Sequence, residues 1–422
     1  MNAPAALSIV KIRPVTAPLA GAVRLPGSKS ITNRALLLAA LARGTSRLTG
    51  ALKSDDTRWM AEALRAMGVA IDEPDETTFV VTADGRLKAP ERALFLGNAG
   101  TATRFLAAAA ALVDGTVIVD GDAHMRRRPI APLVDALRSL GVDATAPTGC
   151  PPVIVVGKGA LAGGHVAIDA SLSSQYVSAM LMAAPGATAP VTLDLVGQDI
   201  GARGYVDLTI AAMSRFGVSV APLGNRAAWR IDPAPYRATD LAIEPDASAA
   251  TYFWAAEALT GGRIDLGAPA ADFTQPDARA HALIAAFPHM PAVIDGSQIQ
   301  DAVPTLAVLA AFNDGPVRFT GIANLRVKEC DRITALAQGL NRLRPGLARE
   351  DGDDLVVDGA AALAGGPARI ATFADHRIAM AFALAGLRLP GVVIEDPGCV
   401  AKTFPTYWQA LAQLGVGLEF RA

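Results

Sequence analysis

Basic and hydroxyl-bearing residues gather in this sequence where a loop leads into a predicted helix. In Leu25–Arg34, LPGSKSITNR, a glycine loop precedes such a helix. Backbone N–H groups at a helix start bind anions, and Lys29 adds a positive charge. Ser30 and Arg34 stand four residues apart and share one helix face. The segment is not a Walker A loop, because a serine separates its last glycine from the lysine. An anion site and a serine-capped helix with exposed basic residues both fit this segment.

Similar groups open three further predicted helices. The motif LGNAGTATR allows close backbone approach at Gly97 and Gly100. Arg128 ends a basic triplet before a helix that starts with proline. Ser171–Gln175 offers three hydroxyls and an amide, which suit phosphate oxygens. Each segment alone also has a structural interpretation, as a helix start, a solvated charge run or an N-cap.

The second half of the chain adds carboxylates beside cations. In Arg326–Arg332, RVKECDR, Lys328 and Arg332 are four residues apart. Like charges at helical spacing repel unless an anion bridges them. Glu329, next to Lys328, is a suitable place for a carboxylate that transfers protons. A salt-bridged surface turn is the structural alternative. Asp301 precedes an apolar helix, for which it would be an acceptable N-cap.

The cations of both halves share one kind of position. They lie at or near predicted helix starts, and they are Lys29, Arg34, Arg128, Lys328, Arg332, Arg377 and Lys402. If the two halves present those helix ends toward each other, the cleft between them attracts anions. Such a cleft fits two phosphate- or carboxylate-bearing substrates better than one.

The composition restricts the class of protein. With 51% apolar and 18% charged residues, the 422-residue chain predicts a large core and two or three domains. A net charge of −2, from 38 basic and 40 acidic residues, argues against a protein that coats nucleic acid or an anionic membrane. Three widely spaced cysteines and five histidines disfavour a zinc cluster and fit a reduced, cytoplasmic protein. We expect neither a signal peptide nor a membrane span.

A unit of about 70 residues recurs six times along the chain. Each unit has an amphipathic helix that ends at a glycine before a short strand, and the glycine is clearest at Gly68, Gly141, Gly217 and Gly415. Each also has an alanine- and leucine-rich helix with almost no polar face, and such a helix is buried. The pattern predicts an α/β fold of the α+β type, with three units per domain and a boundary near residues 233–243. The N-terminal strand in the first 24 residues fits either half.

The motifs together resemble a known family. LPGSKSITNR, LGNAGTATR, SSQYVSAMLMAAP, RVKECDRI, DHRIAMAFAL and AKTFP are similar, in order, to 5-enolpyruvylshikimate-3-phosphate synthases. The resemblance implies two similar domains, 1–24 plus 244–422 and 25–243. Each would hold three βαβαββ units around buried helices, an inside-out α/β barrel. The substrate cleft would lie between the domains, which close on ligand.

The same resemblance implies the reaction and its residues. The family transfers the enolpyruvyl group of phosphoenolpyruvate to the 5-hydroxyl of shikimate 3-phosphate, in aromatic amino acid biosynthesis, without metal or organic cofactor. Shikimate 3-phosphate would contact Lys29, Ser30, Arg34, Ser173, Ser174, Gln175, Tyr205, Asp301, Asn324 and Lys328. Phosphoenolpyruvate would contact Lys29, Gly100, Arg128, Gln175, Arg332, Arg377 and Lys402. Asp301 is the expected base and Glu329 the expected acid, with Lys29 close to both, although the sequence leaves open which group makes which transfer. A monomer without nucleic-acid or membrane partners is expected.

Some positions depart from the family pattern. Phe105 replaces a usual proline, His124 a frequent arginine, Ala202 a phosphate-binding serine and Leu325 a usual tryptophan. Substrate affinity and sensitivity to glyphosate, the family's inhibitor, therefore stay open. The sister transferase acting on UDP-N-acetylglucosamine is disfavoured, because its characteristic cysteine is missing from GDAHMRRRP. A catalytically dead anion-binding protein would not need Asp301 and Glu329.

Overall fold

The chain forms two compact units. The computed structural model describes residues 8–197, 203–224, 227–359, 363 and 365–421. One unit comprises Gly27–Pro245, and the other comprises Met1–Pro26 with Asp246–Ala422. The backbone N–H of Ser28 donates to the carbonyl of Glu244 (2.9 Å) in the first unit, and that of Asp246 donates to Pro26 (2.9 Å) in the second. The chain passes from one unit to the other at Pro26–Gly27 and at Pro245–Asp246. These two backbone hydrogen bonds therefore flank both connections, one bond within each unit.

The described residues of the Gly27–Pro245 unit form three small mixed sheets. Its helices are α1 (Lys29–Leu41), α2 (Asp55–Ala66), α3 (Gly100–Ala109), α4 (Ala131–Ser139), α5 (Ser174–Ala183) and α6 (Arg203–Arg215). Its strands are β3 (Ala42–Thr49), β4 (Ala70–Asp75), β5 (Thr78–Asp84), β6 (Leu94–Phe95), β7 (Asp114–Asp120), β8 (Asp143–Thr145), β9 (Val153–Lys158), β10 (Gly164–Asp169), β11 (Val191–Val196), β12 (Ala221–Pro222), β13 (Ala228–Ile231), β14 (Tyr236–Arg237) and β15 (Leu241–Ala242). The sheets run β14-β3-β5-β4, with β15 also on β3, then β6-β7-β9-β8 and β10-β11-β13-β12.

The other unit is built in the same style. Its helices are α7 (Ala247–Thr260), α8 (Ala280–Ala285), α9 (Val303–Ala310), α10 (Arg332–Leu343), α11 (His376–Arg388) and α12 (Tyr407–Gln413). Its strands are β1 (Ile9–Ile12), β2 (Ala20–Ala22), β16 (Arg263–Asp265), β17 (Val293–Asp295), β18 (Val317–Thr320), β19 (Ala348–Asp351), β20 (Asp354–Val357), β21 (Ala368–Ile370), β22 (Val392–Glu395) and β23 (Leu418–Arg421). The sheets run β16-β2, β17-β18-β20-β19 and β21-β22-β1-β23.

One strand arrangement recurs across these sheets. In β6-β7-β9-β8 the first pair is parallel and the next two pairs are antiparallel. The sheets β10-β11-β13-β12 and β17-β18-β20-β19 repeat that pattern. In β21-β22-β1-β23 the N-terminal strand takes the third place, with Val10 opposite Ile394 on β22 and Phe420 on β23. The sequence had left the partner of this strand open. The fold is mixed α/β.

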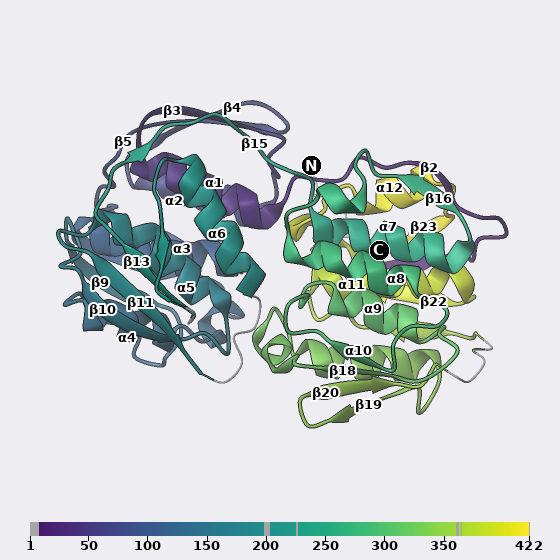
Figure 1. The fold of residues 1–422 in the computed structure, drawn as a ribbon. Helices are drawn as coiled ribbons and strands as arrows, with labels where there is room; N and C mark the ends of the chain where they lie inside the picture. Colours follow the sequence, from purple (N-terminus) through teal and green to yellow (C-terminus); the bar gives the residue numbers. More distant parts are fainter. Residues whose placement is uncertain (1–7, 198–202, 225–226, 360–362, 364, 422) are drawn as a thin grey trace. The chain divides into compact units, whose positions relative to one another are not determined.

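Helices without a polar face are buried, as the sequence predicted. All ten residues of α3 are buried, as are Ile31–Leu41 of α1 and His376–Leu387 of α11. Figure 1 shows α7, α9 and α11 beside one another within their unit, with α10, β18, β19 and β20 on one side of them. Burial on all sides requires that functional groups on these helices stand at their ends. Among the described residues, no helix is long and apolar enough to span a membrane.

The recurring glycines end the amphipathic helices. Gly68, Gly141, Gly217 and Gly415 follow α2, α4, α6 and α12 with φ between 76° and 88°. In each case the next residue is a valine whose N–H donates to the carbonyl five residues earlier, at 3.0–3.1 Å. A left-handed glycine closed by such a bond is a helix C-cap. The Gly-Val pairs in the sequence therefore mark four helix ends.

Replacing Gly141 with alanine is expected to lower the free energy of unfolding by about 1–2 kcal/mol. No heavy atom lies within 4 Å of the added Cβ, so the cost comes from its φ of 76° alone. Gly315 is the matched control, since it also has open space around it and no positive φ. Urea denaturation of the two alanine variants checks this. Equal midpoints for both variants would contradict it.

Candidate active site

In the Gly27–Pro245 unit, Lys29 is the first residue of α1. The Ser28 hydroxyl caps the helix by accepting from the N–H of Ile31 (3.4 Å). The Lys29 ammonium lies 3.4 Å from Asp56, and both side chains are nearly buried (11% and 4% exposed). The loop before the helix needs glycine, because a Cβ on Gly27 would lie 2.0 Å from the Gly50 carbonyl oxygen. The LPGSK motif thus places one cation at the start of a buried helix.

Arg34 donates hydrogen bonds to residues of its own unit. Its guanidinium donates to the hydroxyls of Thr209 (2.7 Å) and Ser178 (3.2 Å) and to the carbonyls of Ser30 (2.9 Å) and Tyr205 (3.1 Å). Burial lowers the pKa of Arg34 to about 10, which still leaves it charged at neutral pH, and the nearby Tyr205 opposes this shift. The arginine therefore ties α1 to α5 and α6, a structural role that its position in the motif did not reveal. Its direct contact with a substrate stays a prediction.

Arg128 lies against the start of α3. Its guanidinium donates to the side-chain oxygen of Asn98 (3.3 Å). A Cβ on Gly100 would lie 2.7–2.9 Å from three guanidinium atoms, so only glycine leaves room for this contact. Of the basic triplet, Arg126 is exposed and paired with Asp120, whereas Arg128 is buried (7% exposed). The solvated-face interpretation thus fits Arg126 and fails for Arg128.

The start of α5 lies next to the start of α3. Ser173 caps α5 by accepting from the N–H of Gln175 (3.2 Å), and the Gln175 amide donates to Thr101 on α3 (3.3 Å). Ser174 is buried at the first position of the helix. Tyr205, on α6, is half-buried, with its ring 6.0 Å from the Arg34 guanidinium. These hydroxyls and amides gather at helix starts, as the sequence indicated.

In the other unit, Arg332 is surrounded by three carboxylates. Its guanidinium donates to Asp375 (2.7 Å), Glu329 (2.8 Å) and Asp301 (3.1 Å), and its side chain is 1% exposed. Burial alone would lower the pKa of Arg332, but Asp375, Glu329 and Asp301 outweigh it and raise the pKa. The cluster therefore holds Arg332 permanently charged and fixed in place.

Two further cations complete this cluster. Arg377 donates to the Asp301 carboxylate (2.7 Å), and the Lys402 ammonium lies 3.1 Å from Glu329. The two carboxylates are 20% and 6% exposed. Asp301 and Glu329 thus each stand between two cations, an arrangement suited to binding anions beside groups that transfer protons.

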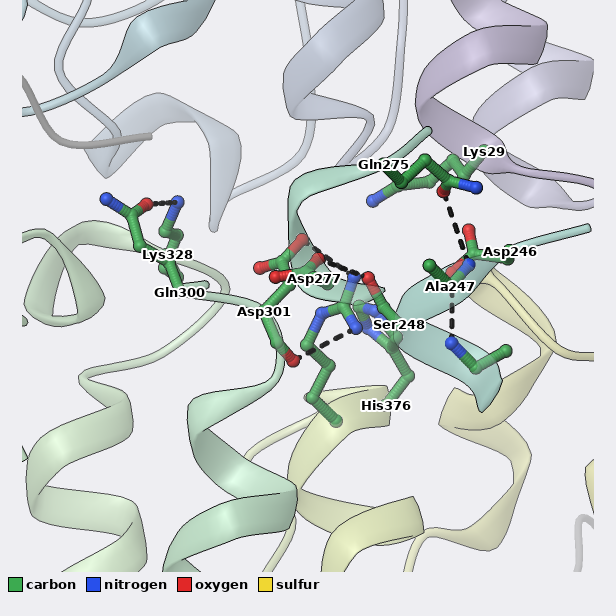
Figure 2. A network of polar contacts seen from close by, with 12 residues as sticks. Lys29, Asp246, Ala247, Ser248, Gln275, Asp277, Gln300, Asp301, Lys328 and His376 are labelled. Carbon is green, nitrogen blue, oxygen red and sulfur yellow. Dashed lines mark hydrogen bonds and ion pairs between the residues drawn. The ribbon is translucent and has the colours of Figure 1, made fainter. Parts of the chain in front are cut away.

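Lys328 and Asn324 lie in the segment before α10. The Lys328 ammonium donates to the side-chain oxygen of Gln300 (3.2 Å), a contact shown in Figure 2. The same figure shows the buried Ser248 hydroxyl on Asp277 (2.6 Å) at the start of α7. The Asn324 side chain is buried (5% exposed), and its oxygen has no hydrogen-bond partner among the described residues. Asn324 therefore has an unused acceptor.

Two expectations about this region were wrong. Asp301 does not cap the helix that follows, because α9 begins at Val303 with Ala302 at its N-cap position, and the carboxylate binds arginines instead. Lys328 and Arg332 do not share a helical turn, because α10 begins only at Arg332, capped by Asp331. The capping side chain keeps the preceding residues out of the helix.

Several partners of the predicted site residues were not themselves among the site residues that the sequence predicted. Asp375 is the main one: it is fully buried, caps α11 and binds Arg332. The sequence had marked Asp375–Arg377 as polar residues at the mouth of a buried helix, but it gave no partner for the carboxylate. Asn98, the partner of Arg128, stands in the LGNAGTATR motif, whereas Asp56 and Gln300, the partners of Lys29 and Lys328, had no such signal. In the described part of the chain, no group of three or more His, Cys, Asp or Glu side chains is placed to hold a metal ion.

Comparisons with known proteins show the family of this chain. The model of the family "EPSP synthase (3-phosphoshikimate 1-carboxyvinyltransferase)" matches residues 14–411. The chain belongs to the EPSP synthase family. It is 67% identical over 418 residues to the 3-phosphoshikimate 1-carboxyvinyltransferase of Rhizobium leguminosarum bv. trifolii, covering 99% of both chains. It is 65% identical to that of Pseudomonas syringae pv. syringae, covering 97% of this chain and 98% of the relative. A solved EPSP synthase from Acinetobacter baumannii superposes with a TM-score of 0.79 at 27% identity, covering 98% of this chain and 100% of that chain.

Three of the positions that depart from the usual EPSP synthase pattern lie in the described structure. Phe105 is fully buried, 5.2 Å below the Arg34 guanidinium. Leu325 is fully buried in the core of its unit. His124 lies next to Arg127, with 3.3 Å between their nitrogens. Ala202 lies outside the described residues. Phe105 and Leu325 are therefore packing residues here.

Proposed function

We infer that the protein transfers the enolpyruvyl group of phosphoenolpyruvate to the 5-hydroxyl of shikimate 3-phosphate and releases phosphate. The observation that carries this inference is 67% identity, over almost the whole of both chains, to a 3-phosphoshikimate 1-carboxyvinyltransferase. The clustered cations and carboxylates support it, because both substrates are anions and the reaction moves protons. A cytoplasmic, monomeric enzyme of aromatic amino acid biosynthesis belongs to the same proposal.

The two substrates share Lys29 and Gln175 and otherwise take different residues of the predicted set. Shikimate 3-phosphate takes Lys29, Ser30, Arg34, Ser173, Ser174, Gln175, Tyr205, Asp301, Asn324 and Lys328. Phosphoenolpyruvate takes Lys29, Gly100, Arg128, Gln175, Arg332, Arg377 and Lys402. The unused Asn324 oxygen supports a contact with a substrate hydroxyl, since a buried acceptor without a partner is costly.

The carboxylates supply the proton transfers. Glu329, in its neutral acid form, gives its proton to the methylene carbon of phosphoenolpyruvate, which becomes a methyl group, and positive charge develops on the neighbouring carbon. The 5-hydroxyl oxygen attacks that carbon and gives its proton to Asp301, forming a tetrahedral intermediate. The bond between that carbon and the phosphate oxygen then breaks, phosphate leaves with the proton that Asp301 took up, and the methyl group returns a proton to Glu329. Lys29 stays close to both events.

The ion pairs arrange the anion site before substrate arrives. Arg377 and Lys402 are held by Asp301 and Glu329 at 2.7 and 3.1 Å, so they are fixed near the two proton-transfer groups. The carboxylate and phosphate of phosphoenolpyruvate share these cations with the catalytic carboxylates. Cations fixed in advance lose little conformational entropy when they bind.

We propose that the two units correspond to the family's two similar domains, which the sequence placed two residues earlier, at 1–24 plus 244–422 and 25–243, with three βαβαββ units each. Residues of both units are needed for each substrate, so the domains close on ligand and exclude water. Small-angle scattering is expected to show a smaller radius of gyration when shikimate 3-phosphate is added. An unchanged radius would contradict domain closure.

Gly100→Ala is expected to raise the KM for phosphoenolpyruvate by about 10-fold or more, since a displacement near 1 Å costs up to about 100-fold. The added Cβ would lie 2.7 Å from an Arg128 nitrogen and push the guanidinium aside. Steady-state kinetics with each substrate varied in turn check this, with Gly315→Ala as the control. An unchanged KM would place Arg128 outside the phosphoenolpyruvate site.

The function itself is tested by identifying the product. Purified protein, phosphoenolpyruvate and shikimate 3-phosphate should yield an enolpyruvyl ether at the 5-oxygen, visible as new vinyl proton signals by NMR. UDP-N-acetylglucosamine should yield none. An ether formed only with the sugar nucleotide would assign the chain to the sister reaction.

A further inference from the structure

The loop before α3 is a tight turn. The N–H of Ala99 donates to the carbonyl of Leu96 (2.9 Å), and Gly97, the second residue of this turn, has a φ of +51°. The Gly97 carbonyl accepts from the N–H of Asp122 (3.0 Å). On that side the backbone of Gly121 approaches so closely that a Cβ on it would lie 2.3 Å from the Gly97 oxygen. One face of the turn is thus fixed by backbone contacts.

The indole of Trp59 covers the other face. A Cβ on Gly97 would lie 2.6, 3.1 and 3.3 Å from three atoms of that ring, and these are the three nearest heavy atoms. Trp59 lies on α2. The guanidinium carbon of its neighbour Arg58 lies 4.7 Å from the centroid of the Trp59 ring system, and the Phe95 ring, from β6, meets it edge-on with 5.3 Å between centroids. Gly97 is therefore held between a side chain from α2 and the backbone at Gly121.

The turn connects Trp59 to the anion-binding arginine. Asn98 follows Gly97, and its side-chain oxygen accepts from Arg128 (3.3 Å). Gly100, two residues further, lies under the same guanidinium. A shift of Gly97 toward the space occupied by Trp59 would move both of these contacts. Trp59 also lines an open groove of about 590 Å³ together with Glu62, Lys88 and Phe95.

We propose that Trp59 is a positioning residue for phosphoenolpyruvate binding, acting through Gly97 on Asn98, Gly100 and Arg128. This inference rests on the proposed function, which assigns Gly100 and Arg128 to that substrate. Trp59 itself touches neither substrate. Because the turn serves one substrate and not the other, losing the indole changes the two KM values unequally.

Trp59→Leu is the direct test. We expect the KM for phosphoenolpyruvate to rise about 10-fold or more through displacement of the turn. The KM for shikimate 3-phosphate should stay within about twofold, as for a substitution remote from its site. Trp59→Phe, which keeps a ring against Gly97, should restore most of the affinity. Phe95→Leu is the matched control, since it removes the other aromatic ring of the groove. Equal changes in both KM values, or none, would overturn the proposal.

A second measurement separates this proposal from the proposed function. Amide hydrogen exchange in the segment 96–104 is expected to be faster in Trp59→Leu than in the wild type or Phe95→Leu, whether or not the protein turns over. Gly97→Ala should also speed amide exchange in this segment. In the double variant Gly97→Ala/Trp59→Leu, the effect of the alanine should be smaller, because its Cβ no longer meets the indole. Unaltered exchange in Trp59→Leu, or fully additive effects in the double variant, would overturn the role of Trp59. Absence of wild-type turnover would overturn the proposed function alone.

Discussion

Glu329→Gln is expected to lower kcat about 10²- to 10⁴-fold, the usual size of a lost acid–base group. The side chain is buried between Arg332 (2.8 Å) and Lys402 (3.1 Å), and glutamine keeps its shape but cannot carry the proton. The KM values should change much less, because Asp301 still holds Arg332 and Arg377. Steady-state kinetics of the purified variant, with both substrates varied, check this.

Glu395→Gln is the matched control for Glu329. Its carboxylate also pairs with an arginine, Arg369, but on the exposed surface of the same unit. This control should keep wild-type turnover, because exposed pairs contribute little. A Glu329→Gln variant with near-normal kcat would show that another group protonates the methylene carbon, and Asp301 would then be the next candidate.

Arg332→Lys is expected to lower kcat/KM for phosphoenolpyruvate by about 100-fold or more, since breaking a buried charge pair costs several kcal/mol. A single ammonium cannot replace a guanidinium that binds Asp301, Glu329 and Asp375 at once. The free energy of unfolding should fall by about 3 kcal/mol, because buried carboxylates lose their partner. Kinetics and urea denaturation check the two effects.

Arg326→Lys is an internal control for that experiment. Arg326 also contacts three carboxylates, those of Asp331 (2.8 Å), Glu350 (2.9 Å) and Asp353 (2.8 Å), but its side chain is 27% exposed. Solvent weakens such pairs, so the expected cost is about 0–1 kcal/mol with unchanged turnover. If Arg326→Lys were as damaging as Arg332→Lys, burial would not explain the importance of Arg332.

Local patterns allowed much of the fold to be predicted. Glycine followed by valine after an amphipathic stretch marked four helix ends, because only a left-handed residue closes the last turn in this way. Helices such as α3, rich in alanine with hardly a polar face, were expected to be buried and are. Lys29 and Ser173 lie at helix starts as expected, since small polar residues cap helices.

Such local patterns could not predict contacts between segments that are far apart in the sequence. Arg332 binds Asp375, 43 residues later in the chain, and Arg34 binds Thr209, 175 residues later. Neither pair has a local signal, so the structural role of Arg34 and the place of Asp375 in the cluster were missed. The segment Arg326–Asp331 was predicted wrongly because a local pattern was present but did not decide the structure. The four-residue spacing of Lys328 and Arg332 suggested a helical turn, but Asp331 caps α10, which begins only at Arg332.

Phosphate release tests the proposed reaction most directly. Purified wild-type protein should release one phosphate per shikimate 3-phosphate consumed when phosphoenolpyruvate is present, and none when either substrate is omitted. Release with UDP-N-acetylglucosamine in place of shikimate 3-phosphate, or no release with the two proposed substrates together, would contradict the account.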